Sequence, residues 1–146
     1  MAIDRLSGDA DVIVVGAGPG GSATAHYLAQ TGLRVLLLEK GTFPRDKICG
    51  DGLTPRAVAE IIRMGINTDG WIRNYSLVAH GGGHRIEVPW PELNSMPSYG
   101  MARARGDLDH DLAKKAGESG ADLREGMTVT GPITHERSGR IIGVEA

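Results

Sequence analysis

Two short apolar runs flank a glycine-rich turn near the beginning of the chain. Val12 to Val15 and Val35 to Leu38 contain only Val, Ile and Leu, as expected of parallel strands that are buried on both faces. Between these runs, residues 22–31 have the length and composition of a helix, and Gly32 suits the left-handed position just past a helix end. The pattern predicts a strand–helix–strand unit over residues 11–40.

The hydrophobic pattern of the remaining chain predicts two more helices and several short strands. Apolar side chains recur at helical spacing over residues 55–64 and 106–119, which we interpret as helices. Residues 41–54 have little periodicity and predict a loop, and loops of this length are usually functional. Short β-like runs at residues 75–80 and 85–88 predict a hairpin. Residues 121–124 predict a single strand, and residues 127–135 and 140–145 predict an antiparallel pair.

The number of predicted parallel strands is small for the length of the chain. At 146 residues the chain has the size of one ordinary domain. A doubly wound nucleotide-binding fold, however, needs more parallel strands than the pattern supplies. We therefore expect residues 1–146 to form one incomplete domain, the N-terminal part of a longer polypeptide. The remainder of that polypeptide, or another chain, would complete the fold.

Composition and charge exclude several classes of protein. The chain has 16 basic and 18 acidic residues and a net charge of −2, so it offers no basic surface for nucleic acid. The single cysteine, Cys49, excludes an internal disulfide framework, and residues 1–10 lack the apolar stretch of a secretion signal. No run approaches the roughly 18 apolar residues of a membrane span. We expect a cytoplasmic protein, for which peripheral contact with a membrane stays open.

The turn after the first predicted strand carries a phosphate-binding motif. Gly16-Ala17-Gly18-Pro19-Gly20-Gly21 matches G-x-G-x-x-G in the expected strand–turn–helix context. In such a turn Gly16 permits the sharp bend, Gly18 lets a pyrophosphate approach the backbone, and Gly21 lets the helix pack against the strand. Glu39, at the tip of the second strand, can accept both ribose hydroxyls of an adenosine. It would repel a 2′-phosphate, which disfavours NADP at this site.

Two further segments carry a family resemblance. Pro44-Arg45-Asp46-Lys47-Ile48-Cys49-Gly50 resembles the P-x-x-[YK]-x-C-G segment of the geranylgeranyl reductase family of flavoproteins. The wider stretch over residues 43–58 is similar to the menaquinone reductases of the mycobacterial type within that family. Residues 105–112, RGDLDHDL, resemble the R-x-x-[FL]-D-x-x-L helix start of the same family. With the strand–helix–strand unit, the resemblance covers nearly the whole chain.

This resemblance implies a fold, a cofactor and a reaction. The fold would be α/β, a Rossmann-like FAD-binding domain of the glutathione-reductase type with an inserted β-hairpin and a C-terminal antiparallel β segment. The cofactor would be FAD, which carries hydride, and NAD(P)H or another reductant would donate electrons transiently. The reaction would be saturation of C=C bonds in an isoprenoid lipid, either a geranylgeranyl lipid or the menaquinone side chain. The 146-residue chain would not catalyse this oxidoreductase reaction alone.

The resemblance also assigns candidate site residues. Cys49 would lie near the flavin on the substrate side and is the catalytic candidate, although a free cysteine is most often a small buried hydrophobe. Arg105, at a helix start, would lie near the pyrophosphate, with Arg103 as the nearest competitor. The expected cofactor-binding residues are Gly16, Gly18, Pro19, Gly20, Gly21, Glu39, Lys40, Arg45, Lys47, Cys49, Gly50, Arg105 and Val129.

Two other kinds of function share these motifs. An aromatic-ring monooxygenase or a flavin-dependent halogenase would have the same strand–helix–strand unit and an arginine near the same helix, and the Cys49-Gly50 pair argues against both. A non-catalytic nucleotide-binding fragment is the alternative from another class. His80 and His84 flank three glycines and have no cysteine or carboxylate cluster beside them in the sequence, so we expect no metal site.

Overall fold

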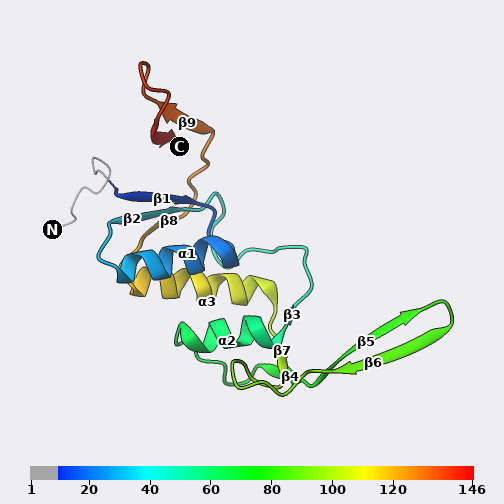
Figure 1. Cartoon of the computed structure of the whole chain (residues 1–146). Coiled ribbons are helices and arrows are strands. Elements are labelled where there is room, and N and C mark those ends of the chain that lie inside the picture. Colours follow the sequence, from blue (N-terminus) through cyan, green and yellow to red (C-terminus); the bar gives the residue numbers. More distant parts are fainter. Residues whose placement is uncertain (1–9) are drawn as a thin grey trace. The chain divides into compact units, whose positions relative to one another are not determined.

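The computed structural model describes residues 10–146, and these form two compact units. The parallel-sheet unit consists of the described residues up to Arg45 together with Asp109–Ala146, and the hairpin unit consists of Asp46–Leu108. Figure 1 labels the helices and strands of both units. Each unit is described by itself below.

Three parallel strands form the centre of the parallel-sheet unit. β1 (Val12–Val15), β2 (Val35–Leu38) and β8 (Asp122–Arg124) lie in the order β1-β2-β8. Val12 is opposite Val35 across the first pair, and Leu36 is opposite Asp122 across the second. The two apolar runs of the sequence are thus neighbouring parallel strands, which confirms the predicted strand–helix–strand unit.

Helices α1 (Pro19–Gln30) and α3 (Arg105–Glu118) complete the core of this unit. α1 begins three residues earlier than predicted because Pro19 occupies the first helical turn, where its missing N–H costs nothing. Figure 1 shows α1 and the later part of α3 side by side on one face of the sheet. Their small residues pack against β2 in a buried cluster of Ala17, Ala25, Val35, Leu37, Ala113, Ala116 and Ala121.

A second, antiparallel sheet of this unit contains β9 (Gly131–Thr134) and β10 (Ile141–Glu145). The antiparallel pair is confirmed, but the prediction that its first strand begins at residue 127 is wrong. The N–H of Met127 donates to the carbonyl of Glu39, so the chain is still bonded to the end of the parallel sheet there. Val129 therefore lies in an irregular segment between β8 and β9 and is half-buried.

The hairpin unit contains one helix and two antiparallel sheets. α2 (Pro55–Arg63) is capped by the Thr54 hydroxyl, which accepts from the N–H of Ala57 at 3.5 Å, as its sequence predicts. The first sheet has the order β3-β7-β4 and the second pairs β5 with β6. Their bounds are β3 (Gly52–Leu53), β4 (Ile72–Asn74), β5 (Ser76–Gly81), β6 (His84–Pro89) and β7 (Gly100–Ala102).

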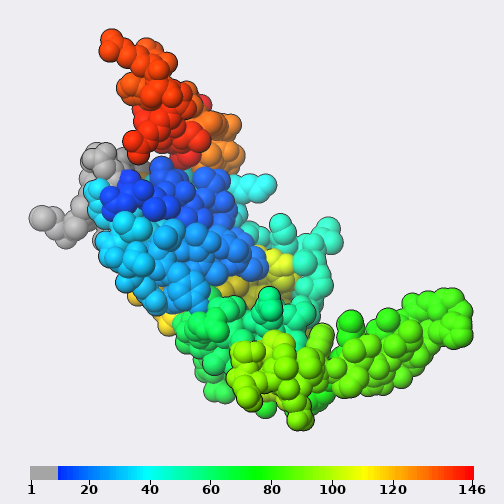
Figure 2. All heavy atoms as spheres, in the orientation of Figure 1, coloured from blue at the N-terminus to red at the C-terminus, as the bar shows by residue number. Residues whose placement is uncertain are grey.

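The β5–β6 hairpin, which we call the arm, has one apolar face. Leu77 is opposite Val88 and Ala79 is opposite Ile86, so these four side chains share one side of the ribbon. Leu77, Ile86 and Val88 are each more than half exposed. Within the hairpin unit the arm projects away from α2, as the ribbon and the space-filling view both show (Figures 1 and 2).

Candidate dinucleotide site

The glycine motif forms a tight turn between β1 and α1. Gly16 has φ +93°, a left-handed conformation that favours glycine. Its N–H donates to the carbonyl of Leu38 at 2.7 Å, which ties the turn to the end of β2. A Cβ atom at Gly21 would collide with the carbonyl oxygen of Gly16, whereas a Cβ at Gly18 would meet no described atom within 4 Å. Gly21 thus serves packing, and Gly18 faces open space.

Glu39 follows β2 directly and places its carboxylate against this turn. Oε2 accepts from the N–H of Ala17 at 2.8 Å, and Oε1 accepts from the N–H of Gly41 at 3.0 Å. The residue is only 4% exposed. The two backbone donors bind one carboxylate oxygen each and fix the orientation of the carboxylate next to the second residue of the glycine motif.

Arg45 joins this carboxylate to α3. Its Nη2 donates to Glu39 Oε2 at 3.3 Å, and its Nε lies 3.3 Å from Oε1 in an ion pair. On its other side, Nη1 lies 3.4 Å from Oδ2 of Asp109, which is fully buried. The Nε atom is buried and has no hydrogen-bond acceptor within residues 10–146.

The electrostatic surroundings keep Glu39 ionised. Burial raises the pKa of Glu39, but the N–H groups of Gly41 and Ala17 and the guanidinium of Arg45 together lower it more. The resulting pKa lies below the ordinary glutamate value. Glu39 is therefore a charged acceptor at neutral pH, which is the form that binds hydroxyl donors most strongly.

These residues fit the adenosine diphosphate end of a dinucleotide. α1 has Gly18 at its N-cap without a side-chain hydrogen bond, so the first N–H groups of the helix are available to phosphate oxygens. The open space at Gly18 and Gly20 leaves room for an approaching group.

The structure shows no contact of the other expected site residues with Glu39 or the glycine turn in the described part of the chain. Lys40 is exposed in the parallel-sheet unit. Lys47, Cys49 and Gly50 are exposed and belong to the hairpin unit. The alternative that Cys49 is a small buried hydrophobe is wrong, because this thiol is exposed. The structure thus brings the glycine motif, Glu39 and Arg45 together, while the Cys49 segment is part of the other unit.

Arg105 is the first residue of α3 and is half-buried. Its N–H donates to Oδ1 of Asp51 at 3.1 Å, and the N–H of Arg103 donates to the Asp51 carbonyl at 3.1 Å. Arg103 also pairs with Asp107 at 3.6 Å. Both arginines are therefore held within the hairpin unit, and their expected contact with a pyrophosphate stays a prediction.

Asp109 is the site residue that sequence analysis did not single out. The sequence does give one indication that Asp109 matters, because Asp109 is the acid of the R-x-x-[FL]-D-x-x-L pattern in RGDLDHDL. The pattern alone does not reveal a partner, since Asp109 and Arg45 are 64 positions apart and meet only through the packing of α3 against the sheet.

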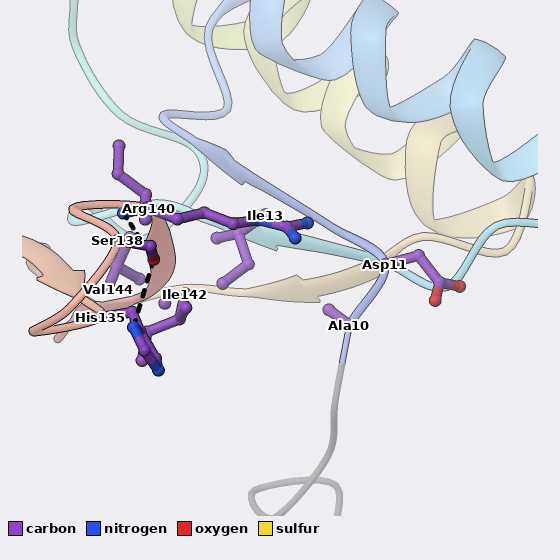
Figure 3. A pocket seen from close by; sticks show the side chains of 10 residues that line it. Ala10, Asp11, Ile13, His135, Ser138, Arg140, Ile142 and Val144 are labelled. Carbon is purple, nitrogen blue, oxygen red and sulfur yellow. Dashed lines mark hydrogen bonds between the residues drawn. The ribbon is translucent and has the colours of Figure 1, made fainter.

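A cavity of about 650 Å³ lies between the beginning of β1 and the β9–β10 hairpin. Figure 3 shows His135, Ser138 and Arg140 around it, with a hydrogen bond of 3.2 Å between the Ser138 hydroxyl and His135 Nδ1. Its lining residues at the beginning of β1, which are Ala10, Asp11 and Ile13, precede the glycine turn. Ligands of open α/β sheets bind at the carboxyl ends of strands, so this cavity is separate from the dinucleotide site.

Residues 10–146 contain no group of three or more His, Cys, Asp and Glu side chains that could hold a metal ion. In the same part of the chain, no helix combines the length and the apolar character that crossing a membrane requires. His80 and His84 lie on the arm, where both are exposed.

Comparison with known proteins decides the family. Residues 9–140 match the model of a family described as FAD binding domain. The chain belongs to this family. The family supports FAD as the dinucleotide of this Rossmann-like fold, and the expected α/β class is confirmed.

Individual relatives agree with this assignment. The chain is 46% identical over 148 aligned residues to the menaquinone reductase of Mycobacterium tuberculosis, an alignment that covers 99% of this chain and 35% of that protein. A geranylgeranyl bacteriochlorophyll reductase-like protein from Thermoplasma acidophilum superposes with a TM-score of 0.72 at 28% identity, over 87% of this chain and 32% of that one. The chain thus spans about a third of the length of these relatives, and it resembles the family of FAD-dependent oxidoreductases to which they belong.

The fold is shared with flavoproteins of another activity. A myxobacterial chondrochloren halogenase superposes with a TM-score of 0.79 at 26% identity, over 92% of this chain and 32% of that one. Similarity of fold alone therefore does not distinguish a reductase from a halogenase, and the distinction depends on the site residues.

Proposed function

We propose that this chain forms the adenosine-binding part of an FAD-dependent reductase that saturates C=C bonds of an isoprenoid chain, with the menaquinone side chain as the favoured substrate. The observation that carries the proposal is the 46% identity to a menaquinone reductase across 99% of the chain, including the Pro44–Gly50 segment. Because the chain spans about a third of that relative, the reaction is proposed for the whole polypeptide.

Each residue of the site has a role in holding the cofactor. The N–H groups at the beginning of α1 bind the pyrophosphate, and Gly18 lets it reach the backbone. Glu39 accepts the ribose hydroxyls. Arg105 at the beginning of α3 supplies a fork of donors for phosphate oxygens. FAD when bound would supply the hydride chemistry, and NAD(P)H or another reductant would reduce it.

Glu39→Ala tests the location of the cofactor. Loss of a charged hydrogen-bond acceptor should weaken FAD binding by roughly 1–3 kcal/mol, measured in the full chain by quenching of flavin fluorescence. Glu60→Ala is a matched control, because Glu60 is a half-exposed glutamate on α2 in the other unit. If the Glu39→Ala chain binds FAD as tightly as the unchanged chain, FAD does not bind at Glu39.

The reaction itself is tested with the complete polypeptide and a reduced electron donor. Menaquinone should gain hydrogen at a side-chain double bond, detected by mass spectrometry, without consumption of oxygen. Oxygen consumption with a hydroxylated or halogenated product would favour the monooxygenase or halogenase alternative, which the superposition on a halogenase supports. Bound flavin without any turnover would favour a non-catalytic nucleotide-binding protein.

A further inference from the structure

We propose that Arg45, anchored by Asp109, is a positioning residue that holds Glu39 in the orientation and charge state in which it binds the adenosine ribose. This inference rests on the proposed role of Glu39 in binding FAD. Neither Arg45 nor Asp109 needs to touch the reacting part of the cofactor for this role. Arg45 would act on the Glu39 carboxylate by direct contact. Asp109 would act on it through Arg45.

The first step is the way in which Arg45 meets Glu39. One edge of the guanidinium faces both carboxylate oxygens: Nη2 donates to Oε2 at 3.3 Å, and Nε lies 3.3 Å from Oε1 in an ion pair without a hydrogen bond. Such a two-point contact fixes the plane of the carboxylate as well as its position. The N–H groups of Ala17 and Gly41 alone would leave the carboxylate with two donors of fixed position and no countercharge.

The second step is the anchoring of Arg45 itself. Its Nη1 lies 3.4 Å from Oδ2 of Asp109, and its guanidinium carbon lies 5.1 Å from the centre of the Phe43 ring. That ring in turn stacks on His110 with 5.7 Å between ring centres and only 4° between ring planes. The N–H of Phe43 donates to Glu125 at 2.9 Å. The segment that carries Arg45 is thus attached to both α3 and the chain after β8.

The third step is charge. Glu39 and Asp109 are both buried, and their side chains are 5% and 0% exposed. Buried carboxylates are costly unless a cation and hydrogen bonds compensate them. Arg45 lies between the two as the shared cation. Removing it would raise the pKa of Glu39, weaken it as an acceptor and allow its side chain to turn away from the ribose position.

Arg34 provides a matched control for the experiment. It makes the same kind of contact with Asp11, with Nη2 at 3.0 Å from Oδ1 and Nε at 3.3 Å from Oδ2. This pair is in the same unit, but its side chains are 64% and 39% exposed. Arg34→Met therefore removes an equivalent interaction that lies on the surface and away from Glu39.

The experiment measures FAD affinity of the full chain for Arg45→Met, Arg45→Lys, Asp109→Asn and the control Arg34→Met. We expect Arg45→Met to weaken FAD binding roughly ten- to a hundredfold. Arg45→Lys should recover part of the loss, because an ammonium restores the charge without the two-point contact. Asp109→Asn should weaken binding less than Arg45→Met, and Arg34→Met should leave it unchanged. Circular dichroism of each variant without FAD checks folding, and the lysine variant decides the outcome if the methionine variant does not fold.

A double-mutant cycle separates positioning from a general structural effect. In the Glu39→Gln background, Arg45→Met should cost little further affinity, because the carboxylate through which it acts is already absent. Equal losses in both backgrounds would overturn the proposal, as would unchanged affinity of Arg45→Met and Arg45→Lys. Unchanged affinity of Glu39→Gln alone would instead overturn the location of FAD in "Proposed function", so the two failures are distinguishable.

Discussion

The core of the parallel-sheet unit and the arm of the hairpin unit differ in how much of their apolar surface is buried. In the parallel-sheet unit, Leu37 on the central strand and Ala25 on α1 are fully buried, and the Glu39 carboxylate is hydrogen-bonded within the unit. On the arm of the hairpin unit, Leu77 is 56% exposed and Ile86 is 60% exposed. An isolated two-stranded hairpin is marginally stable. The difference teaches that the nucleotide site is built on a buried core, whereas we expect the arm to contribute little to the stability of its unit.

The largest expected effect tests this difference directly. Leu37→Ala should lower the free energy of unfolding by about 2–5 kcal/mol, because it leaves a cavity in the core between β2 and the helices. Leu77→Ala removes the same atoms from the arm and should change stability by less than about 0.5 kcal/mol. Chemical denaturation of the full chain measures both values. A loss at Leu77 as large as that at Leu37 would show that the arm is covered in the full chain.

The glycine motif allows a similar test within one turn. Gly21→Ala should destabilise the protein by about 1–3 kcal/mol, because the new Cβ collides with the carbonyl of Gly16. Gly18→Ala meets open space, so the melting temperature without FAD should stay the same while FAD affinity falls. A normal melting temperature for Gly21→Ala would show that the turn relaxes around the added methyl group.

Local patterns predicted the parts of the fold that depend on neighbours in sequence. The strands around residues 11–40, the capped helix α2 and helix α3 each have a continuous apolar pattern and an end signal. β3 and β7 were not predicted, because Gly52–Leu53 and Gly100–Ala102 have no alternation of apolar and polar residues that would indicate a strand. They exist through pairing with partners far away in the chain, such as Gly52 with Ala102.

The site shows the same difference between contacts of sequence neighbours and contacts of distant segments. The glycine motif and Glu39 form one local unit, and their placement against each other followed from the sequence. Arg45 was expected among the cofactor-binding residues, but the sequence did not reveal its contact with Asp109. This contact depends on how α3 packs on the sheet, which no local pattern specifies. The relation of Cys49 to the cofactor likewise depends on packing between segments and stays a prediction.

A buried histidine makes the stability of the parallel-sheet unit dependent on pH. His26 on α1 is 1% exposed, with Nδ1 at 2.6 Å from the Ser119 hydroxyl and Nε2 at 3.1 Å from the amide nitrogen of Gln30. Ser119 donates its own hydrogen to the carbonyl of Lys115, so we assign Nδ1 as the donor and Nε2 as the acceptor. The ring is then neutral, and a proton on Nε2 would face the Gln30 amide hydrogens.

The direction of the pH effect follows from this environment. Burial, helped by the charge of Lys115, lowers the pKa of His26 from its ordinary value of 6.5. The unfolded chain therefore binds a proton more readily than the folded one, and folding stability rises with pH in this window. The contribution of neutral His26 to folding stability should be complete above about pH 6.5. It should be lost as the pH falls through the lower pKa that His26 has in the folded chain. Denaturation of His26→Gln should lack this dependence, whereas the arm variant His84→Gln should retain it.

The smallest effect on stability is expected at Cys49, which the family resemblance makes the catalytic candidate. Cys49 is exposed, so Cys49→Ser should change the free energy of unfolding by less than about 0.5 kcal/mol. At the junction of flavin and substrate, where the family resemblance would put Cys49, the serine hydroxyl would keep the size of the thiol but change its polarity and acidity. We therefore expect the complete Cys49→Ser polypeptide to bind FAD with near-normal affinity and to reduce its lipid more slowly or at a different double bond. Lipid products, flavin content and melting temperature measured on one preparation separate these effects. Normal turnover with an unchanged product pattern would remove Cys49 from the active site and restrict the functional residues of this chain to the parallel-sheet unit and Arg105.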